Sequence, residues 1–198
     1  IVYMKEEFTV IEGKRPLLLS APHNSLHKRP NLSGKYRQAE EFTGEIVKEV
    51  CALTGAWGIY LSKNIDYDPS YFPLVRNPYK KAVKRICEGN DIKYFIDIHG
   101  MALDSHLDFA FYYPLGFRNS KNLTSLLEEN LAKGKLDGCS TVVYNFPESS
   151  RKSLGEFLAS KLRIPSSQIE IARYIREEKE LREVFIKNLA DVITKHFV

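Results

Sequence analysis

Two histidines of this chain, His23 and His99, each close an apolar segment of the sequence. His23 ends the segment 16–23 (PLLLSAPH), and His99 lies near the end of the segment 94–100 (YFIDIHG). Apolar runs of this length, bounded by turn residues and rich in aromatic and β-branched side chains, are typical of buried strands. In open α/β sheets, ligands collect just beyond the carboxyl ends of the strands. The two strand-end histidines therefore predict one metal site.

Two glutamates could complete this site. Zinc in a hydrolytic site takes three protein ligands, commonly two histidines and one carboxylate, and keeps one position for water. Glu40 is the candidate carboxylate, because the loop after His23 could fold it back over the same sheet edge. A metal held in this way lowers the pKa of water and polarises a carbonyl group. Proton transfer needs a further carboxylate, and we assign it to Glu170, which carries an ionisable group into the otherwise apolar segment 168–172.

Both glutamates also have ordinary structural interpretations. Glu40 stands beside Glu41, and either could complement the dipole of a helix from its first turn, which is the simpler interpretation of their spacing. Glu170 could form a buried ion pair with Arg173, or it could face solvent on an edge strand. These alternatives stay open at the level of sequence.

The other histidines and Asp97 carry less information. Asp97 and His99 point to the same side of the predicted strand, so Asp97 could orient a metal-binding His99 or form a structural hydrogen bond. His196 falls near the carboxyl end of a predicted helix, where positive charge is favourable. His27 remains ambiguous.

The elements that must position these residues alternate between strand and helix. Predicted strands cover residues 8–11, 17–20, 57–61, 94–100, 108–113, 141–144 and 168–171, and predicted helices cover 38–54, 78–88, 122–132, 154–162 and 178–197. A helix between two strands indicates a parallel crossover connection. The pattern predicts an α/β fold in a single domain over residues 1–198, with a mixed, largely parallel sheet and helices on both faces.

Composition limits the classes of function. The 198 residues include 29 basic and 25 acidic side chains, a formal net charge of +4, and the basic residues are scattered among acidic ones, which argues against nucleic-acid binding. Cys51, Cys87 and Cys139 lack CxxC spacing and fit reduced thiols in a cytoplasm. The amino end is too polar for a signal peptide, and no apolar run approaches membrane-spanning length. We expect a cytoplasmic protein that does not bind membranes, and its oligomeric state is not predicted.

Five short motifs occur in the order expected of the N-formylglutamate amidohydrolase family. They are SAPH at 20–23, EEFTG at 40–44, IDIHG at 96–100, YNFP at 144–147 and IEIARY at 169–174. The chain resembles this family from residue 18 to about residue 175. The family is similar to the zinc carboxypeptidases in fold and site. The resemblance implies Zn²⁺ held by two histidines and one carboxylate, with a glutamate as general base.

The motifs can be carried over residue by residue. The resemblance implies His23, Glu40 and His99 as zinc ligands, with Glu41 as the alternative to Glu40, and Glu170 as the general base.

Four further residues resemble groups that hold a substrate. They are Arg76, Asn77, Asn145 and Arg173. A planar guanidinium suits this task because it pairs with a carboxylate through two hydrogen bonds. The alternatives are a solvated loop charge for Arg76, a structural pair with Glu170 for Arg173, and ordinary turn chemistry for Asn145.

The chain departs from the family after Pro147. Many members carry a glycine pair there, whereas this chain continues with ESSRK at 148–152. The change restricts the backbone and adds charge near the expected mouth of the site, which argues against formylglutamate itself as the substrate.

The sequence as a whole predicts a zinc-dependent hydrolase. We expect it to cleave a C–N amide bond in an N-acylated, formyl-type amino acid or a short peptide that carries a carboxylate. One alternative is a carboxypeptidase-like metallopeptidase that uses the same residues. A second is a non-catalytic relative that binds a metal or a ligand.

Overall fold

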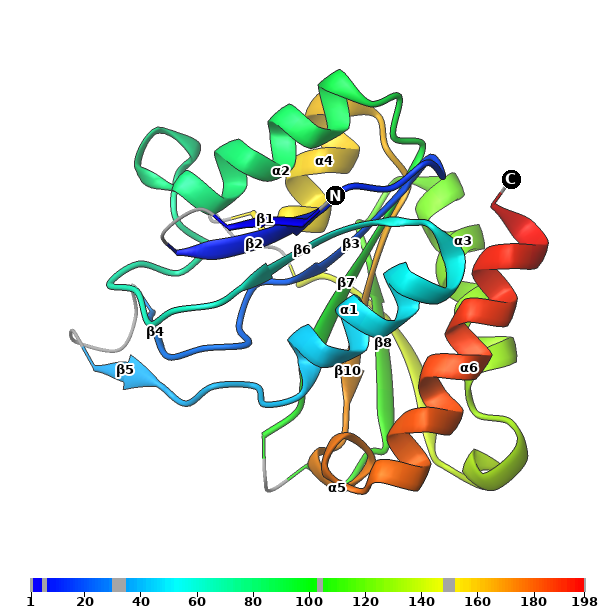
Figure 1. Ribbon diagram of the computed structural model, residues 1–198. Coiled ribbons are helices and arrows are strands. Elements are labelled where there is room, and N and C mark those ends of the chain that lie inside the picture. The colour runs from blue at the N-terminus through cyan, green and yellow to red at the C-terminus, as the bar shows by residue number, and fades with distance from the viewer. Residues whose placement is uncertain (1, 5–6, 30–34, 103–104, 148–151, 198) are drawn as a thin grey trace.

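The computed structural model describes residues 2–4, 7–29, 35–102, 105–147 and 152–197. Among these residues, eight strands form one sheet in the order β1-β2-β6-β3-β7-β10-β8-β9 (Figure 1). The strands are β1 (Val2–Met4), β2 (Phe8–Ile11), β3 (Leu17–Ala21), β6 (Trp57–Leu61), β7 (Tyr94–Gly100), β8 (Phe109–Tyr113), β9 (Thr141–Asn145) and β10 (Ser166–Ile171). The four central strands β6, β3, β7 and β10 are parallel, whereas β2 is antiparallel to β6 and β8 is antiparallel to β10.

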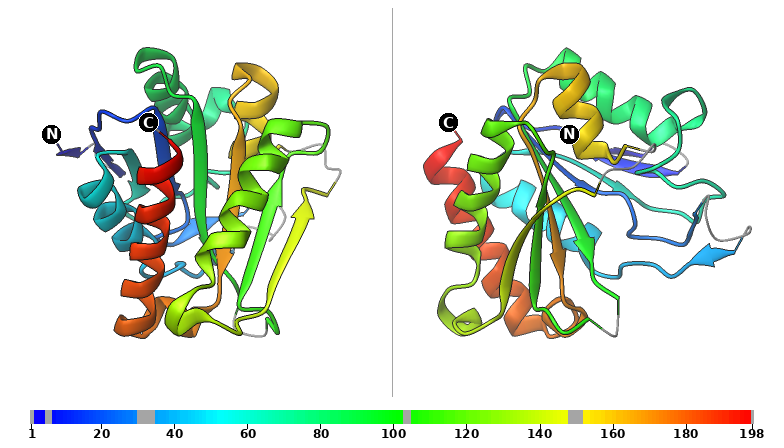
Figure 2. Two further views of the ribbon diagram at one scale, coloured as in Figure 1. Left: turned by 90° about the vertical axis from the view of Figure 1, so that its right-hand side faces the viewer. Right: turned by 180° about the vertical axis from the view of Figure 1, so that it is seen from behind.

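Helices cover both faces of this sheet. The helices are α1 (Thr43–Thr54), α2 (Pro78–Gly89), α3 (Arg118–Leu131), α4 (Leu154–Leu162), α5 (Arg173–Glu177) and α6 (Lys179–His196), with short 3-10 helices η1 (Leu74–Arg76) and η2 (Gly134–Leu136). Helices α1, α3 and α6 pack on one face, and α2 and α4 pack on the other (Figure 2). This arrangement confirms the predicted α/β class with a mixed, largely parallel sheet covered on both sides.

Strand β3 shows why the central strands read as continuous apolar runs. Leu17 and Leu19 belong to the core under α1 and α6, whereas Leu18 belongs to the core under α2 and α4. All three side chains are fully buried. A strand covered on both faces is apolar at nearly every position, so each polar residue near its end needs a specific explanation.

The alternation of side chains along β7 sets the direction of its polar residues. Ile96 and Ile98 pack into the core under α1 and α6, whereas Phe95 packs into the core under α2 and α4. Because successive side chains of a strand point to opposite faces, Asp97 and His99 lie on the α2/α4 face. The prediction that these two residues share a side of the strand is confirmed.

The pairing of β10 with β7 brings a carboxylate beside His99. Glu170 is in register with His99, and Gln168 is in register with Asp97. Ile169 packs on the opposite face, into the core under α1 and α6. Glu170 and Gln168 therefore point to the same face as the polar residues of β7.

The topology explains why His23 meets His99. Strand β3 continues through α1 to β6, toward one end of the sheet, whereas β7 continues to β8 on the other side. Neighbouring strands whose onward connections diverge leave a crevice at their carboxyl ends. His23 follows β3 by two residues, and His99 is the last residue but one of β7.

Helix α1 begins at Thr43, not at Gln38 as predicted. Phe42 has a left-handed backbone conformation with φ of 66°, which interrupts the helix. The side chain of Asn24 accepts a hydrogen bond from the Gly44 amide at 2.8 Å and so replaces a local cap. The prediction that Glu40 and Glu41 occupy the first turn of this helix is therefore wrong.

Several small elements were not predicted. They are β1, the two-stranded sheet of β4 (His27–Lys28) and β5 (Tyr36–Arg37), the helix α5, and both 3-10 helices. Each is shorter than the window over which hydrophobic periodicity becomes informative. Strand β10 lies between β7 and β8, so the interpretation of Glu170 as a residue of an edge strand is wrong.

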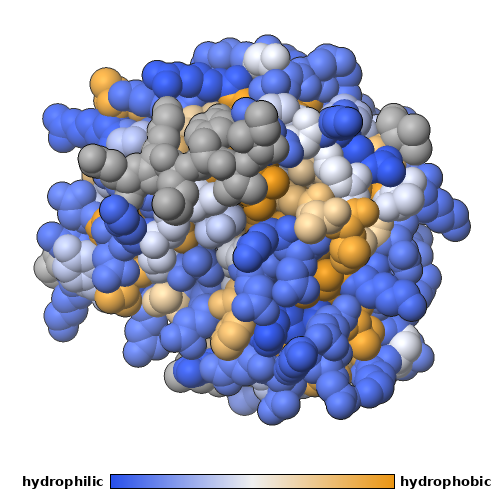
Figure 3. All heavy atoms as spheres, in the orientation of Figure 1, coloured by the Kyte–Doolittle hydropathy of each residue, from blue (hydrophilic) through white to orange (hydrophobic). Residues whose placement is uncertain are grey.

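The helices and one face of the surface show how polar the outside of the molecule is. Every helix in the described part of the chain is too short or too polar to cross a lipid bilayer. The face shown in Figure 3 is mainly hydrophilic, and its hydrophobic side chains form an interrupted band among hydrophilic ones.

Candidate active site

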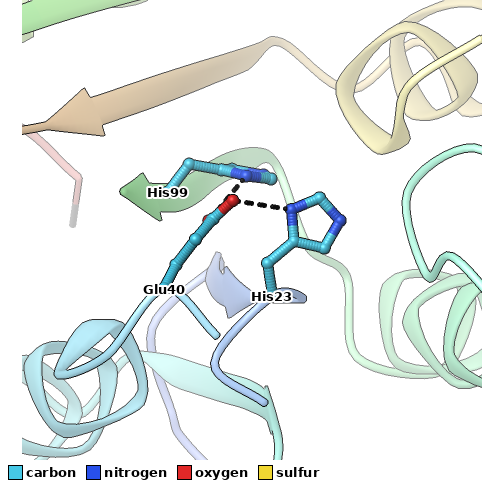
Figure 4. Close-up of side chains that lie close together, drawn as sticks. All are labelled: His23, Glu40 and His99. Atoms are coloured by element: carbon cyan, nitrogen blue, oxygen red, sulfur yellow. Dashed lines mark hydrogen bonds and ion pairs between the residues drawn. The ribbon is translucent and has the colours of Figure 1, made fainter. Parts of the chain in front are cut away.

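Three predicted side chains meet at the carboxyl end of the central strands. The Nδ1 atom of His23 lies 3.0 Å from Oε1 of Glu40, and the Nδ1 atom of His99 lies 3.2 Å from Oε2 of the same carboxylate (Figure 4). All three residues are buried. Of the two adjacent glutamates, Glu40 is the one that faces the histidines, while the Glu41 side chain is 61% exposed.

Backbone contacts fix Glu40 in this position. Its amide donates to the His23 carbonyl at 2.8 Å, and the Thr43 hydroxyl donates to its carbonyl at 2.7 Å. The Gly100 amide, one residue beyond His99, donates to Oε2 of Glu40 at 3.0 Å. The carboxylate is thus held from both histidine segments.

Two arginines of the carboxyl-terminal third secure the segment around Glu40. The guanidinium of Arg176 donates to the Ile171 carbonyl at 3.1 Å and to the Glu41 carbonyl at 2.5 Å. Arg182 stacks its guanidinium over the ring of Phe42, 4.5 Å from the ring centre. These contacts stabilise the left-handed turn that separates Glu40 from helix α1.

A carboxylate also faces the distal nitrogen of each histidine. Nε2 of His23 lies 3.1 Å from Asp68, and Nε2 of His99 lies 3.2 Å from Asp97. Asp68 is itself fixed, because the Ser70 amide donates to its Oδ1 at 2.9 Å. Metal-binding histidines commonly present the second ring nitrogen to a carboxylate, which sets the tautomer and the ring orientation.

The charges in this cluster favour a bound cation. Burial disfavours the protonated form of His23 and His99, but the surrounding carboxylates outweigh burial and raise the pKa of both. Burial likewise disfavours ionised Glu40, but the two histidines outweigh it and hold its pKa well below the ordinary range. The buried carboxylates of Glu40, Asp68 and Asp97 thus draw positive charge to this point.

The donor set fits zinc. Two imidazole nitrogens and one carboxylate converge, and both imidazoles are oriented by further carboxylates, which is the ligand chemistry of a catalytic zinc site. In addition, Nε2 of His99 and both oxygens of Asp97 are buried without a well-formed hydrogen bond. Buried polar atoms without a full set of hydrogen bonds are expected where an ion completes the site.

A second group of possible ligands, His23, His27 and Asp68, fits a metal poorly. The rings of His23 and His27 are stacked with centroids 3.9 Å apart and planes inclined by 6°. The nitrogen lone pairs of two stacked imidazoles lie in parallel planes, so they do not converge on one ion. Burial and the neighbouring His23 lower the pKa of His27 to about 4. We therefore interpret His27 as a neutral ring that supports the plane of His23.

Glu170 lies beside the cluster and remains separate from its three converging groups. Its Oε1 accepts a hydrogen bond from the side-chain amide of Gln168 at 2.8 Å. Burial raises the pKa of Glu170, although the nearby His99 opposes this effect. Arg173 instead pairs with Glu177 and, at 3.9 Å, with Glu41, so the interpretation of a structural Glu170–Arg173 pair is wrong.

Three of the predicted substrate-binding residues, all within the described part of the chain, form no hydrogen bond or ion pair with His23, Glu40 or His99. Arg76 is exposed on η1, and Asn145 is exposed at the end of β9, where its amide donates to the next carbonyl. Asn77 is fully buried, but its side chain caps α2 at the Lys80 amide and donates to carbonyls of the loop 68–72. The departure at 148–151 lies outside the described residues.

Arg173, by contrast, lines a cavity next to the cluster. The cavity has a volume of about 710 Å³, and its wall includes Glu40 and Gly100. Arg176 and Arg37 line the same cavity. Of the four predicted substrate-binding residues, Arg173 is the one that shares a cavity wall with Glu40.

Sequence reasoning missed Asp68 and Arg176. Asp68 lies in the loop after β6, whose carboxyl end reaches the same sheet edge as β3 and β7, so the predicted topology could have indicated it. Arg176 offers no comparable signal. Its role depends on a short helix after β10 and on contacts with the distant carbonyl of Glu41.

A scan against protein-family models gives no match, and a search of curated proteins gives none either. Solved structures, however, share the fold. N-acetylmuramoyl-L-alanine amidase AmiC2 of Nostoc punctiforme is 18% identical, with a TM-score of 0.56 over 93% of this chain and 98% of that one. Succinylglutamate desuccinalase from Vibrio parahaemolyticus is 11% identical, with a TM-score of 0.60 over 97% of this chain and 72% of that one.

A metallo-carboxypeptidase from Burkholderia cenocepacia is similar as well. It is 9% identical, with a TM-score of 0.61 over 96% of this chain and 60% of that one. At such identities the likeness shows a zinc-carboxypeptidase-like fold. It does not show the N-formylglutamate amidohydrolase family itself.

Proposed function

We propose that this protein is a zinc-dependent hydrolase that cleaves the C–N amide bond of an N-acylated amino acid or a short peptide. The observation that carries the proposal is the convergence of His23, Glu40 and His99 with Glu170 on the neighbouring strand. The names of the three similar structures, an amidase, a desuccinalase and a metallo-carboxypeptidase, support the same class of reaction.

His23, Glu40 and His99 would hold the zinc ion. When bound, a zinc ion would act as a Lewis acid that polarises the amide carbonyl and lowers the pKa of water. Asp68 and Asp97 hold the two imidazoles in the orientation that presents Nδ1 to the site. The Glu40 amide donates to the His23 carbonyl, and the Gly100 amide donates to the Glu40 carboxylate, so this carboxylate stays between the two rings.

Glu170 acts as the general base. It removes a proton from the attacking water and delivers it to the nitrogen of the leaving amine, so the same carboxylate serves both steps. Burial raises its pKa above that of an exposed glutamate, which favours returning the proton to the leaving nitrogen. The Gln168 amide fixes one of its oxygens and leaves the other available.

The adjacent glutamates provide the sharpest test. We expect Glu40→Gln to lose bound zinc and hydrolytic activity, because the amide removes the anionic ligand between the histidines. Glu41→Gln is the matched control and should keep its zinc, because this side chain is exposed and turned away from the histidines. Zinc content is measured by mass spectrometry and hydrolysis on N-acyl amino acids. Equal zinc content in the two variants would remove the proposal.

The carboxypeptidase-like alternative uses the same residues and differs in its substrate. It predicts hydrolysis of short peptides with free carboxyl ends and no hydrolysis of N-acyl amino acids. Assaying both substrate types with the same zinc-loaded protein separates the two activities.

A further inference from the structure

The cavity beside Glu40 has no role in the steps described above. It opens from Glu40 and Gly100 and extends over Tyr36, Met101 and Arg173. Its volume of about 710 Å³ lies in the range of pockets that hold a small organic molecule. A formyl group has a single carbon atom and would leave this space unused.

The positions of the catalytic groups decide which part of the substrate faces the cavity. Glu170 must reach the leaving nitrogen, so the amine part of the substrate lies toward Glu170. Glu170 is not among the residues that line the cavity, whereas Glu40 is. The acyl part of the substrate therefore has access to this space.

The charged residues of the cavity wall favour an anion. Arg37, Arg173 and Arg176 reach it from β5 and α5. Its acidic residues are Glu40, which is engaged with the two histidines, and Glu41, which lies 3.9 Å from Arg173. Without Glu40, which belongs to the metal cluster, the wall has three arginines and one glutamate, so its net charge is positive.

Two of these arginines are free to exchange partners. Arg173 pairs with Glu177 and Glu41 at the surface, where ion pairs are weak and readily replaced. Arg37 forms no ion pair with any residue that the structure describes. Arg176, in contrast, is held by two backbone carbonyls and forms a fixed part of the wall.

Apolar side chains complete the wall. Leu26, Met101 and Ala102 line the cavity together with the arginines. A short methylene chain that ends in a carboxylate would contact both kinds of surface.

We propose that this cavity is an acyl subsite for a dicarboxylic acid, so that the preferred substrate is an amide whose acyl group carries its own carboxylate. Arg37 and Arg173 bind that carboxylate, and Arg176 shapes the wall behind it. The inference rests on the proposed function, because it takes the amide carbonyl to lie at the His23–Glu40–His99 cluster.

Binding of succinate and butyrate to the zinc-loaded protein tests this subsite without catalysis. Both acids have four carbons and one carboxylate for the metal cluster, but only succinate has a second carboxylate for the arginines. Isothermal titration calorimetry should show that succinate binds at least about tenfold more tightly than butyrate. In Arg37→Gln and Arg173→Gln, the ratio of the butyrate dissociation constant to the succinate dissociation constant should fall toward one.

Arg85→Gln is the matched control, because Arg85 is exposed on α2 and does not line the cavity. It should keep the wild-type ratio. A ratio near one in the wild type, or an unchanged ratio in both cavity variants, would overturn the subsite.

Hydrolysis assays separate the subsite from the proposed function. N-succinyl and N-butyryl derivatives of one amino acid are compared. If neither is hydrolysed while the succinate preference holds, the proposed function fails and the subsite stands. If amides are hydrolysed but succinate and butyrate bind equally well, the subsite fails and the proposed function stands.

Discussion

Glu40 and Glu41 differ in environment although they are neighbours in the chain. Glu41 begins a tight turn that the Thr43 amide closes by donating to the Glu40 carbonyl at 3.3 Å, so the two side chains point in different directions and only one faces the histidines. Glu40 turns inward between His23 and His99, and Glu41 turns outward toward Arg173. The choice between two equal carboxylates is therefore made by the backbone conformation at this point.

Glu170→Gln tests whether Glu170 is the general base. The amide cannot accept the proton of water, so we expect kcat to fall by about 10²–10⁴-fold. Zinc content should stay the same, because Glu170 is outside the converging set of ligands. Kinetics on an N-acyl amino acid and metal analysis are measured on the same sample.

Glu183→Gln is the control for this change, because its side chain is exposed and pairs with Lys179 on α6. It should keep most of the wild-type kcat. Full hydrolytic activity in Glu170→Gln would instead show that another group acts as the base.

Asp68→Asn tests the orientation of His23. The asparagine keeps the shape but loses the negative charge that faces Nε2 at 3.1 Å. Loss of such a partner typically weakens metal binding by about 10–100-fold. A competition assay with a zinc chelator measures this affinity. Asp66→Asn, an exposed change in the same loop, should leave it unchanged; equal affinities in the two variants would contradict the assigned role.

At the residue level, the sequence predicted those groups whose position follows from the strand pattern. His23 and His99 were found because each ends a buried strand. The contact of Asp68 with His23 depends on the path of a long loop, and that of Arg176 with Glu41 depends on tertiary packing. Periodicity carries no information on either path.

At the level of elements, the end of β7 is packed against α5. A Cβ atom at Gly100 would lie 2.5 Å from Cζ of Arg176. A flexible side chain could move aside, but this guanidinium is buried and bonded to the carbonyls of Ile171 and Glu41. The glycine in IDIHG thus permits the approach that secures the Glu40 segment.

Gly100→Ala should therefore destabilise the protein by about 1–3 kcal/mol, the usual cost of overpacking a well-ordered site. It should also weaken zinc binding, because the Gly100 amide donates to Glu40. Urea denaturation and chelator competition measure the two effects. Gly89→Ala, at the end of α2 with open space around it, is the control and should be neutral or slightly stabilising. Equal stability of the two variants would contradict this packing argument.

Long, regular elements were predictable, and their junctions were not. The bounds of β2, β6, β7 and α4 agree with the predicted ranges, because each has a clear apolar pattern and a clear stop. The start of α1 was misplaced because its cap comes from Asn24, far away in the sequence, and because Phe42 adopts a left-handed conformation. A single sequence does not reveal a cap supplied by a distant residue.

At the scale of the whole molecule, folding gathers ionisable groups that are far apart in the chain. The cluster draws His23, Glu40, Asp68, Asp97 and His99 into the interior from segments spread over residues 23–99. A cation that binds only the folded chain stabilises it. At a free zinc concentration of about 100 times the dissociation constant, linkage gives about 2.7 kcal/mol. This corresponds to a rise of about 5–10 °C in the unfolding temperature for a chain of this size.

The increase in unfolding temperature that zinc causes should depend on pH. Without metal, His23 and His99 have a pKa raised above 6.5, so their contribution to stability is complete below that pH and is lost as the pH rises through the raised values. Zinc requires the neutral imidazoles, and so it binds better as the pH rises. The increase in unfolding temperature caused by zinc should thus be larger at about pH 8 than at about pH 6.

Calorimetric scans with zinc and with chelator measure this increase at the two pH values. His196→Ala should keep the difference between them, and His99→Ala should abolish it. Equal increases at both pH values in the wild type would show that zinc does not bind at these histidines.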